Sequence, residues 1–157
     1  MVEKFMKSAL KEAIKAYSID EVPIGAIIVK DGKIIARAHN LRETSMQATA
    51  HAEILAIQKA CRKLKAWRLE DCDMYVTLEP CPMCAGAIIN ARIRNLYFGA
   101  KDPKSGVAGS KFNIFEDYAF NHKVNVYSGI LEEDCSQLLS DFFKELRIKK
   151  LDLSNHS

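Results

Sequence analysis

The chain has 157 residues, of which 48% are hydrophobic and 27% are charged. This length suits one domain with its own hydrophobic core, and the composition excludes a disordered or fibrous chain. The formal net charge of +3 permits an anionic partner but does not require one.

The first half of the chain shows helical and strand patterns in turn. Apolar residues at helical spacing predict two helices, and two short β-branched runs predict two strands. Asp31-Gly32 between these runs is typical of a tight hairpin turn. The predicted elements are a helix over 5–17, strands over 24–30 and 33–39, a polar segment over 40–47 and a helix over 49–64.

The second half alternates strands with helices. Pro103, Gly106 and Gly109 predict a loop over 101–110. The other predicted elements are a strand over 74–78, a helix over 81–91, a strand over 96–99, a helical turn over 112–118, a strand over 124–128 and a helix over 132–149.

This alternation predicts an α/β fold, a three-layer α/β/α sandwich with a mixed, roughly five-stranded central sheet. We expect one domain over 1–157, without repeats or linkers, and a frayed tail over 152–157. No secretory leader is evident, and the longest uncharged stretch, 80–91, is too short to cross a bilayer. We therefore expect a cytoplasmic protein with reduced thiols and no membrane partner.

Two short clusters carry the chemistry, His51-Ala52-Glu53 and Cys81-Pro82-Met83-Cys84. Residues i and i+3 of a helix share a face, so Cys81 and Cys84 can direct both sulfurs at one atom. With the His51 imidazole they would form a three-ligand zinc site whose fourth position stays open for water, as in catalytic sites. Mixed thiolate and imidazole ligands favour zinc over magnesium or calcium.

Glu53 follows the candidate ligand His51 by two residues. A carboxylate near the metal can take a proton from the activated water and deliver it elsewhere. A thioredoxin-like redox pair is an alternative for the two cysteines, but that motif normally sits at the first strand-helix junction, and here it follows the third predicted strand. A structural zinc site would need a fourth ligand that no second C-x-x-C or H-x-x-x-H supplies.

The combination H-x-E…P-C-x-x-C is the signature of zinc deaminases. Residues 49–53 and 77–89 together closely resemble the bacterial tRNA-specific adenosine deaminases, within the cytidine deaminase-like superfamily. The resemblance extends over most of the chain, from about Lys4 to Arg147, and includes segments 22–29, 98–110, 129–131 and 138–143.

This resemblance implies hydrolysis of the wobble adenosine of a tRNA anticodon to inosine, with release of ammonia. Water held by one zinc ion per subunit would attack C6, with Glu53 as the proton shuttle. It also implies a homodimer, for which residues 81–91 and 92–94 are the candidate interface. The substrate-binding residues that we assign are Asn40, Ala52, Asp102, Lys104, Ser105 and Phe142.

Position alone favours a turn for Asn40, and only the resemblance assigns it to the purine. Further candidate RNA contacts are the cations Arg92, Arg94, Lys101, Lys144, Arg147, Lys149 and Lys150. Two alternatives remain open. One is a deaminase of a free base or nucleoside such as guanine or cytosine, and the other is a zinc-stabilised binding module without catalysis, which would not need Glu53.

Overall fold

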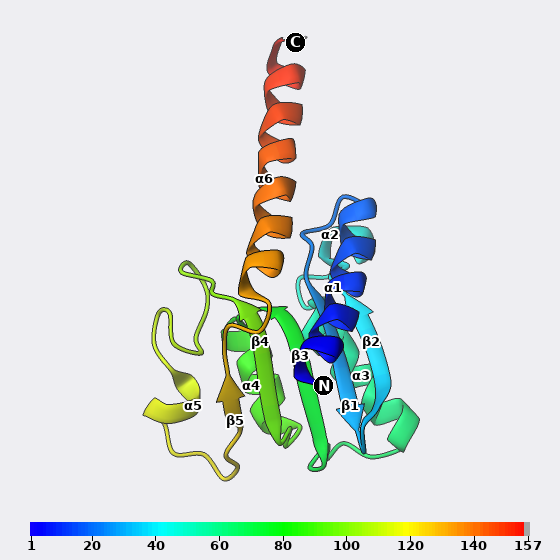
Figure 1. Ribbon diagram of the computed structural model, residues 1–157, viewed down its shortest axis with the longest axis vertical. Coiled ribbons are helices and arrows are strands. Elements are labelled where there is room, and N and C mark those ends of the chain that lie inside the picture. Colours follow the sequence, from blue (N-terminus) through cyan, green and yellow to red (C-terminus); the bar gives the residue numbers. More distant parts are fainter. Residues whose placement is uncertain (156–157) are drawn as a thin grey trace.

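The computed structural model describes residues 1–155 and shows helices on both faces of a mixed β-sheet (Figure 1). The helices are α1 (Val2–Ser18), α2 (Arg42–Ser45), α3 (Ala52–Leu64), α4 (Pro82–Asn90), α5 (Ile114–Asp117) and α6 (Glu132–Asn155). The strands are β1 (Gly25–Lys30), β2 (Lys33–His39), β3 (Cys72–Leu78), β4 (Asn95–Ala100) and β5 (Asn125–Tyr127). Each predicted helix and strand has a counterpart, and α2 is a short helix inside the segment predicted only as polar.

Within residues 1–155 the sheet has five strands, in the order β2-β1-β3-β4-β5. Strand β1 is antiparallel to β2 and β3, whereas β3, β4 and β5 are parallel. The hairpin prediction is confirmed, because Asp31 and Gly32 have φ values of 51° and 74°, and a type I′ turn requires two positive φ angles. The predicted mixed sheet is confirmed as well.

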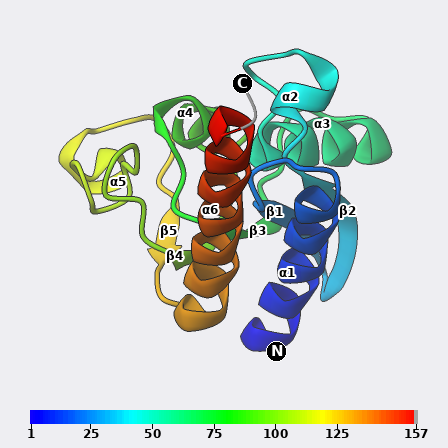
Figure 2. The ribbon, with the colours of Figure 1, turned by 90° about the horizontal axis from the view of Figure 1, so that it is seen from above.

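Alternate residues of β1 pack into two separate cores, since successive side chains point to opposite faces. On β1, Ala26 and Ile28 join the core with α3 and α4. Their neighbours Ile27 and Val29 join the core with α1 and α6. Figure 2 shows these helix pairs on opposite sides of the sheet, which is the predicted three-layer arrangement.

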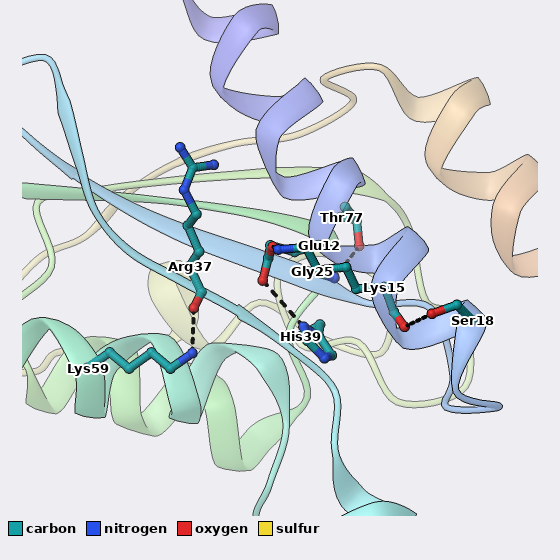
Figure 3. A network of polar contacts seen from close by, with 8 residues as sticks. All are labelled: Glu12, Lys15, Ser18, Gly25, Arg37, His39, Lys59 and Thr77. Carbon is teal, nitrogen blue, oxygen red and sulfur yellow. Dashed lines mark hydrogen bonds and ion pairs between the residues drawn. The ribbon is translucent and has the colours of Figure 1, made fainter.

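Helix α1 crosses the sheet closely at Gly25, the first residue of β1. A Cβ atom at Gly25 would lie 2.5 Å from the backbone nitrogen of Ala13, so only glycine fits there. The Gly25 N–H donates to Thr77 Oγ1 over 3.1 Å, and Glu12 Oε1 lies 3.3 Å from His39 Nδ1 (Figure 3). These contacts join α1 to one end of β1, β2 and β3.

Helix α6 is longer than the sequence pattern predicts. It continues from Glu132 to Asn155 rather than ending at Lys149, and it rises well beyond the sheet (Figure 1). Residues 152–155 are therefore helical where a frayed tail was predicted, and residues 156 and 157 lie outside the described residues. Among the described helices, none is both long and apolar enough for a bilayer crossing.

Candidate metal centre and its cavity

Two neighbouring helix starts bring the predicted metal ligands together. His51 is the N-cap residue of α3, and Cys81 is the N-cap residue of α4, with Pro82 in the first turn, where no amide hydrogen is needed. Cys84 lies one helical turn after Cys81. The Nδ1 atom of His51 lies 3.7 Å from Cys81 Sγ and 3.6 Å from Cys84 Sγ.

These distances fit a zinc ion. Zinc bonds of about 2.3 Å to sulfur and 2.1 Å to nitrogen, at tetrahedral angles, separate a sulfur from a nitrogen by about 3.6 Å. The three candidate ligand atoms all lie within 4.8 Å of one another. The side chains of His51, Cys81 and Cys84 can therefore hold zinc without rearrangement, and a tetrahedral ion would keep one position for another ligand.

The electrostatics of the cluster favour a thiolate. Hydrogen bonds from Cys84 and then from His51 lower the pKa of Cys81 to about 4, although burial opposes them. Donation to Cys81, together with burial, raises the pKa of Cys84. The helix N-terminus adds partial positive charge near both sulfurs. The cluster thus already stabilises the deprotonated form that binds metal.

Glu53 lies in the first turn of α3, beside this cluster, and its side chain is buried. Burial raises the pKa of Glu53 to about 7, and the negative charge of Cys81 acts in the same direction. A carboxyl group with a pKa near neutrality takes up and releases protons equally well at neutral pH. This is the property that a proton shuttle requires.

A cavity of about 890 Å³ opens onto the cluster. Three polar side chains of the cluster, those of His51, Glu53 and Cys81, are among its lining residues. Its walls come from the α1–β1 connection, the β2–α2 connection, the end of β3, the loop after β4 and one face of α6. The wall residues are Val22, Ile24, Asn40, Arg42, Leu78, Glu79, Lys101, Asp102, Pro103, Lys104, Ser105, Leu139, Ser140, Phe143, Leu146, Arg147 and Lys150.

Asn40 is both a turn residue and a cavity residue. Its Nδ2 donates to the Val22 carbonyl over 3.3 Å, and its Oδ1 accepts from the Arg42 N–H over 3.2 Å. A primary amide has two donor hydrogens and two acceptor lone pairs. One donor and one acceptor are therefore left for a ligand, on a side chain that the backbone holds in place.

Asp102, Lys104 and Ser105 line the cavity, and their binding of the substrate remains a prediction. Asp102 Oδ1 accepts from the backbone N–H groups of Lys104 and Ser105, which shapes this loop as a tight turn. Ala52 is buried in the core at the start of α3 and is not among the cavity-lining residues. Its assignment to the substrate remains a prediction.

The assignment of Phe142 to the pocket is corrected. Phe142 is 7% exposed and packs edge-on against Tyr17 of α1, with ring centroids 5.5 Å apart. Its neighbour Phe143 is 41% exposed and lines the cavity. Adjacent helical residues point about 100° apart, so only one of them can face the site. The sequence gives no register for α6 and could not decide between them.

The predicted cations divide into two groups. Lys101, Lys104, Arg147 and Lys150 line the cavity, and Arg42 joins them. The others do not. Arg92 and Arg94 precede β4, whereas the cavity lies beyond its other end, and six strand residues span about 20 Å. Their partners are elsewhere: Arg92 lies over the Trp67 ring and Arg94 pairs with Asp73.

On α6 the helical register separates the basic side chains. Lys149 Nζ lies 3.2 Å from Asp20 Oδ1, beside the C-terminal end of α1. Lys144 lines a separate groove between α1 and α6. Arg147 and Lys150 are three positions apart and face the cavity together with Phe143.

Sequence reasoning missed Glu79. Its side chain is 2% exposed, and its carboxylate accepts hydrogen bonds from three residues of the loop after β4. Burial alone would raise the pKa of Glu79, but bonds from the Ser110 hydroxyl and from backbone N–H groups outweigh it and lower the pKa.

Comparisons with known proteins agree with this site. The family model of the MafB19-like deaminases matches residues 2–147. A tRNA-specific adenosine deaminase of Bacillus subtilis (strain 168) is 56% identical over 148 residues, which cover 94% of this chain and 92% of that protein. The chain belongs to the tRNA-specific adenosine deaminase family.

The chain is also similar to solved structures of deaminases. A structure from a study of A-to-I editing by tRNA:A34 deaminases at the wobble position has a TM-score of 0.84 and 49% identity, covering 87% of this chain and 99% of that one. A guanine deaminase from Bacillus subtilis has a TM-score of 0.62 and 38% identity, covering 92% of each chain.

Proposed function

We propose that this deaminase hydrolyses the wobble adenosine of a tRNA anticodon to inosine and ammonia, with one zinc ion per subunit on His51, Cys81 and Cys84. The observation that carries the proposal is the buried Glu53 carboxyl beside a three-ligand cluster. The family relationship supports it, since a protein 56% identical is a tRNA-specific adenosine deaminase.

The reaction needs a nucleophile and a group that moves protons. Zinc, when bound, supplies the first by lowering the pKa of water to about 7. Glu53 supplies the second. Its carboxylate accepts a proton from the attacking water and delivers it to purine N1. It then accepts the proton of the new C6 hydroxyl group and delivers it to the departing amino group, so that the C6 carbonyl of inosine forms as ammonia leaves. Water and adenosine together contain all the atoms of inosine and ammonia, so no oxidant or further reactant enters.

Binding of the purine rests on Asn40 and on the depth of the site. The free donor and acceptor of the Asn40 amide can bond the edge of a base whose C6 lies near the cluster. A base in a duplex cannot reach a buried centre without leaving its stack. An anticodon loop is single-stranded, so its wobble nucleotide enters at small cost.

The rim of the cavity supports an RNA substrate over a free base. It carries the cations Arg42, Lys101, Lys104, Arg147 and Lys150, which a small uncharged base does not need. Phe143 is the aromatic side chain on this rim, and it can stack on a base beside the wobble position. Lys104 and Ser105 lie in a turn whose geometry Asp102 fixes.

We also propose a homodimer through the outer face of α4, and action in the cytoplasm, where tRNA is modified. A second cavity, of about 690 Å³, lies along α4, and its lining includes Met83, Ala87 and Ile89. The exposed Phe120 ring borders it. An apolar surface of this kind suits a subunit contact. Sedimentation of a monomer at micromolar concentration would contradict the dimer.

A substrate panel tests the proposed activity. Zinc-loaded protein is incubated with an anticodon stem-loop carrying a wobble adenosine, and in parallel with adenosine, cytidine and guanine. Inosine in the stem-loop alone is the expected result. Deamination of guanine alone would assign the chain to the activity of its 38% identical structural relative. Absence of any deamination, with zinc bound, would favour a binding module.

A further inference from the structure

Glu79 stands between the metal-ligand turn and the loop that borders the substrate cavity. Residue 79 follows the last residue of β3 and precedes Pro80 and the ligand Cys81. The backbone already ties the two segments together. The Glu79 N–H donates to the Ala100 carbonyl over 2.9 Å, and the Val107 N–H donates to the Pro80 carbonyl over 3.1 Å.

The carboxylate adds a second set of bonds, all directed to the loop. Its Oε1 accepts from the Asp102 N–H over 3.0 Å and from the Ser110 hydroxyl. Its Oε2 accepts from the N–H groups of Ala108, over 2.9 Å, and Ser110, over 3.1 Å. Within residues 1–155, every recorded hydrogen bond to this carboxylate comes from residues 102–110.

The loop is also shaped around this side chain. A Cβ atom at Gly106 would lie 2.5 Å from Glu79 Oε2 and 2.6 Å from the Asp102 carbonyl, so the loop closes over the carboxylate only with glycine there. Backbone N–H groups that converge in this way form an anion-binding nest. Here the anion is part of the chain, and it fixes Asp102, whose side chain in turn orders Lys104 and Ser105.

We propose that Glu79 is a positioning residue for the RNA substrate. It holds residues 102–110 in the conformation that presents Lys104 and Ser105 at the rim of the cavity. This inference rests on the proposed function, because the substrate that the loop meets is the RNA. Glu79 acts on substrate binding through the loop. It neither binds the metal nor transfers a proton.

The Glu79→Gln variant separates these roles. Glutamine keeps one carbonyl acceptor but turns an NH₂ group toward backbone N–H donors, so part of the nest is lost while the side-chain volume is kept. We expect KM for the stem-loop to rise about tenfold or more, because a displaced loop misplaces its contacts. Turnover at saturating RNA stays within about twofold, since the proton shuttle is untouched. Zinc content stays at the wild-type value.

Glu12→Gln is the matched control, because Glu12 is likewise a buried carboxylate, 4% exposed, and is absent from the cavity lining. It should leave KM unchanged at a comparable loss of thermal stability. A Glu79→Gln variant with wild-type KM, or with turnover and zinc content falling together, would overturn the proposal.

Amide hydrogen exchange gives a readout that needs no substrate. In Glu79→Gln, exchange over 102–110 should quicken about tenfold, and in Glu12→Gln it should not. Wild-type protein that makes no inosine in the stem-loop would refute the proposed function instead. Unchanged exchange over 102–110 would refute the role of Glu79 whatever the substrate.

Discussion

The sharpest test of the RNA interface lies on α6, where neighbouring cations point in different directions. Arg147 and Lys150 line the cavity, whereas Lys149 pairs with Asp20 beside α1. Alanine at each of the three positions removes one positive charge from the same helix. The variants therefore change the net charge equally and differ in which surface they alter.

The expected magnitude follows from counterion release. Each phosphate contact to single-stranded RNA contributes about 0.7 to the slope of log K against log salt. The Arg147→Ala and Lys150→Ala variants should each lower the slope by about 0.7, and the double variant by about 1.4. If the double variant and the wild-type protein bind RNA equally at 1 M salt, a slope loss of about 1.4 makes the double variant bind about tenfold more weakly than wild type at 0.15 M salt.

The assay is fluorescence anisotropy of a labelled anticodon stem-loop, with zinc-loaded protein, at several salt concentrations. Lys149→Ala should keep the wild-type slope, because its ammonium group faces Asp20. An equal slope loss in Lys149→Ala and Lys150→Ala would refute the assignment of one face of α6 to RNA. It would show that only the net charge of the helix matters.

The remaining predictions concern packing, acid stability and the metal. Phe142→Ala should lower the free energy of unfolding by about 3 kcal/mol by leaving a cavity against α1, and Phe143→Ala should cost less but raise KM for RNA. Urea unfolding and initial rates check both, and equal stabilities would contradict the corrected register. Burial raises the pKa of Glu21, but hydrogen bonds from backbone N–H groups outweigh it and lower the pKa below its value in the unfolded chain. The ionised Glu21 side chain therefore stabilises the fold above about pH 4.3, and this stabilisation is lost as the pH falls further. Glu21→Gln should therefore be less stable than wild type at pH 7 and approach it at pH 3, and a constant difference would count against this. Cys84→Ser should lower bound zinc well below one ion per chain and lower Tm, and full zinc occupancy by a colorimetric assay would exclude Cys84 as a ligand.

Local signals were enough to predict the elements and to single out the three candidate ligands that the structure brings together. Strand and helix patterns predicted each main strand and helix within a few residues, except for the C-terminal end of α6, and Asp31-Gly32 predicted the hairpin. Cys81 and Cys84 are close in sequence, so their convergence follows from helix geometry. His51 joins them because α3 and α4 begin at the same edge of the sheet, which the strand order decides.

Features that depend on register between distant segments could not be predicted. The orientation of Phe142 and Phe143 depends on how α6 rotates against α1, and no local pattern specifies that rotation. The same register separates Lys149 from Lys150. Glu79 was missed because its partners lie 23 to 31 residues away. A buried carboxylate whose partners are backbone amides leaves no complementary charge in the sequence to find.

The role of Glu53 is tested by inosine formation in an anticodon stem-loop with wild-type protein and with Glu53→Gln, at matched zinc content. Wild-type protein should form inosine at the wobble position. The Glu53→Gln variant should lose at least about a hundredfold in rate, because it keeps its metal but cannot move the proton. Equal rates for the two proteins would contradict the role of Glu53 and with it the proposed mechanism.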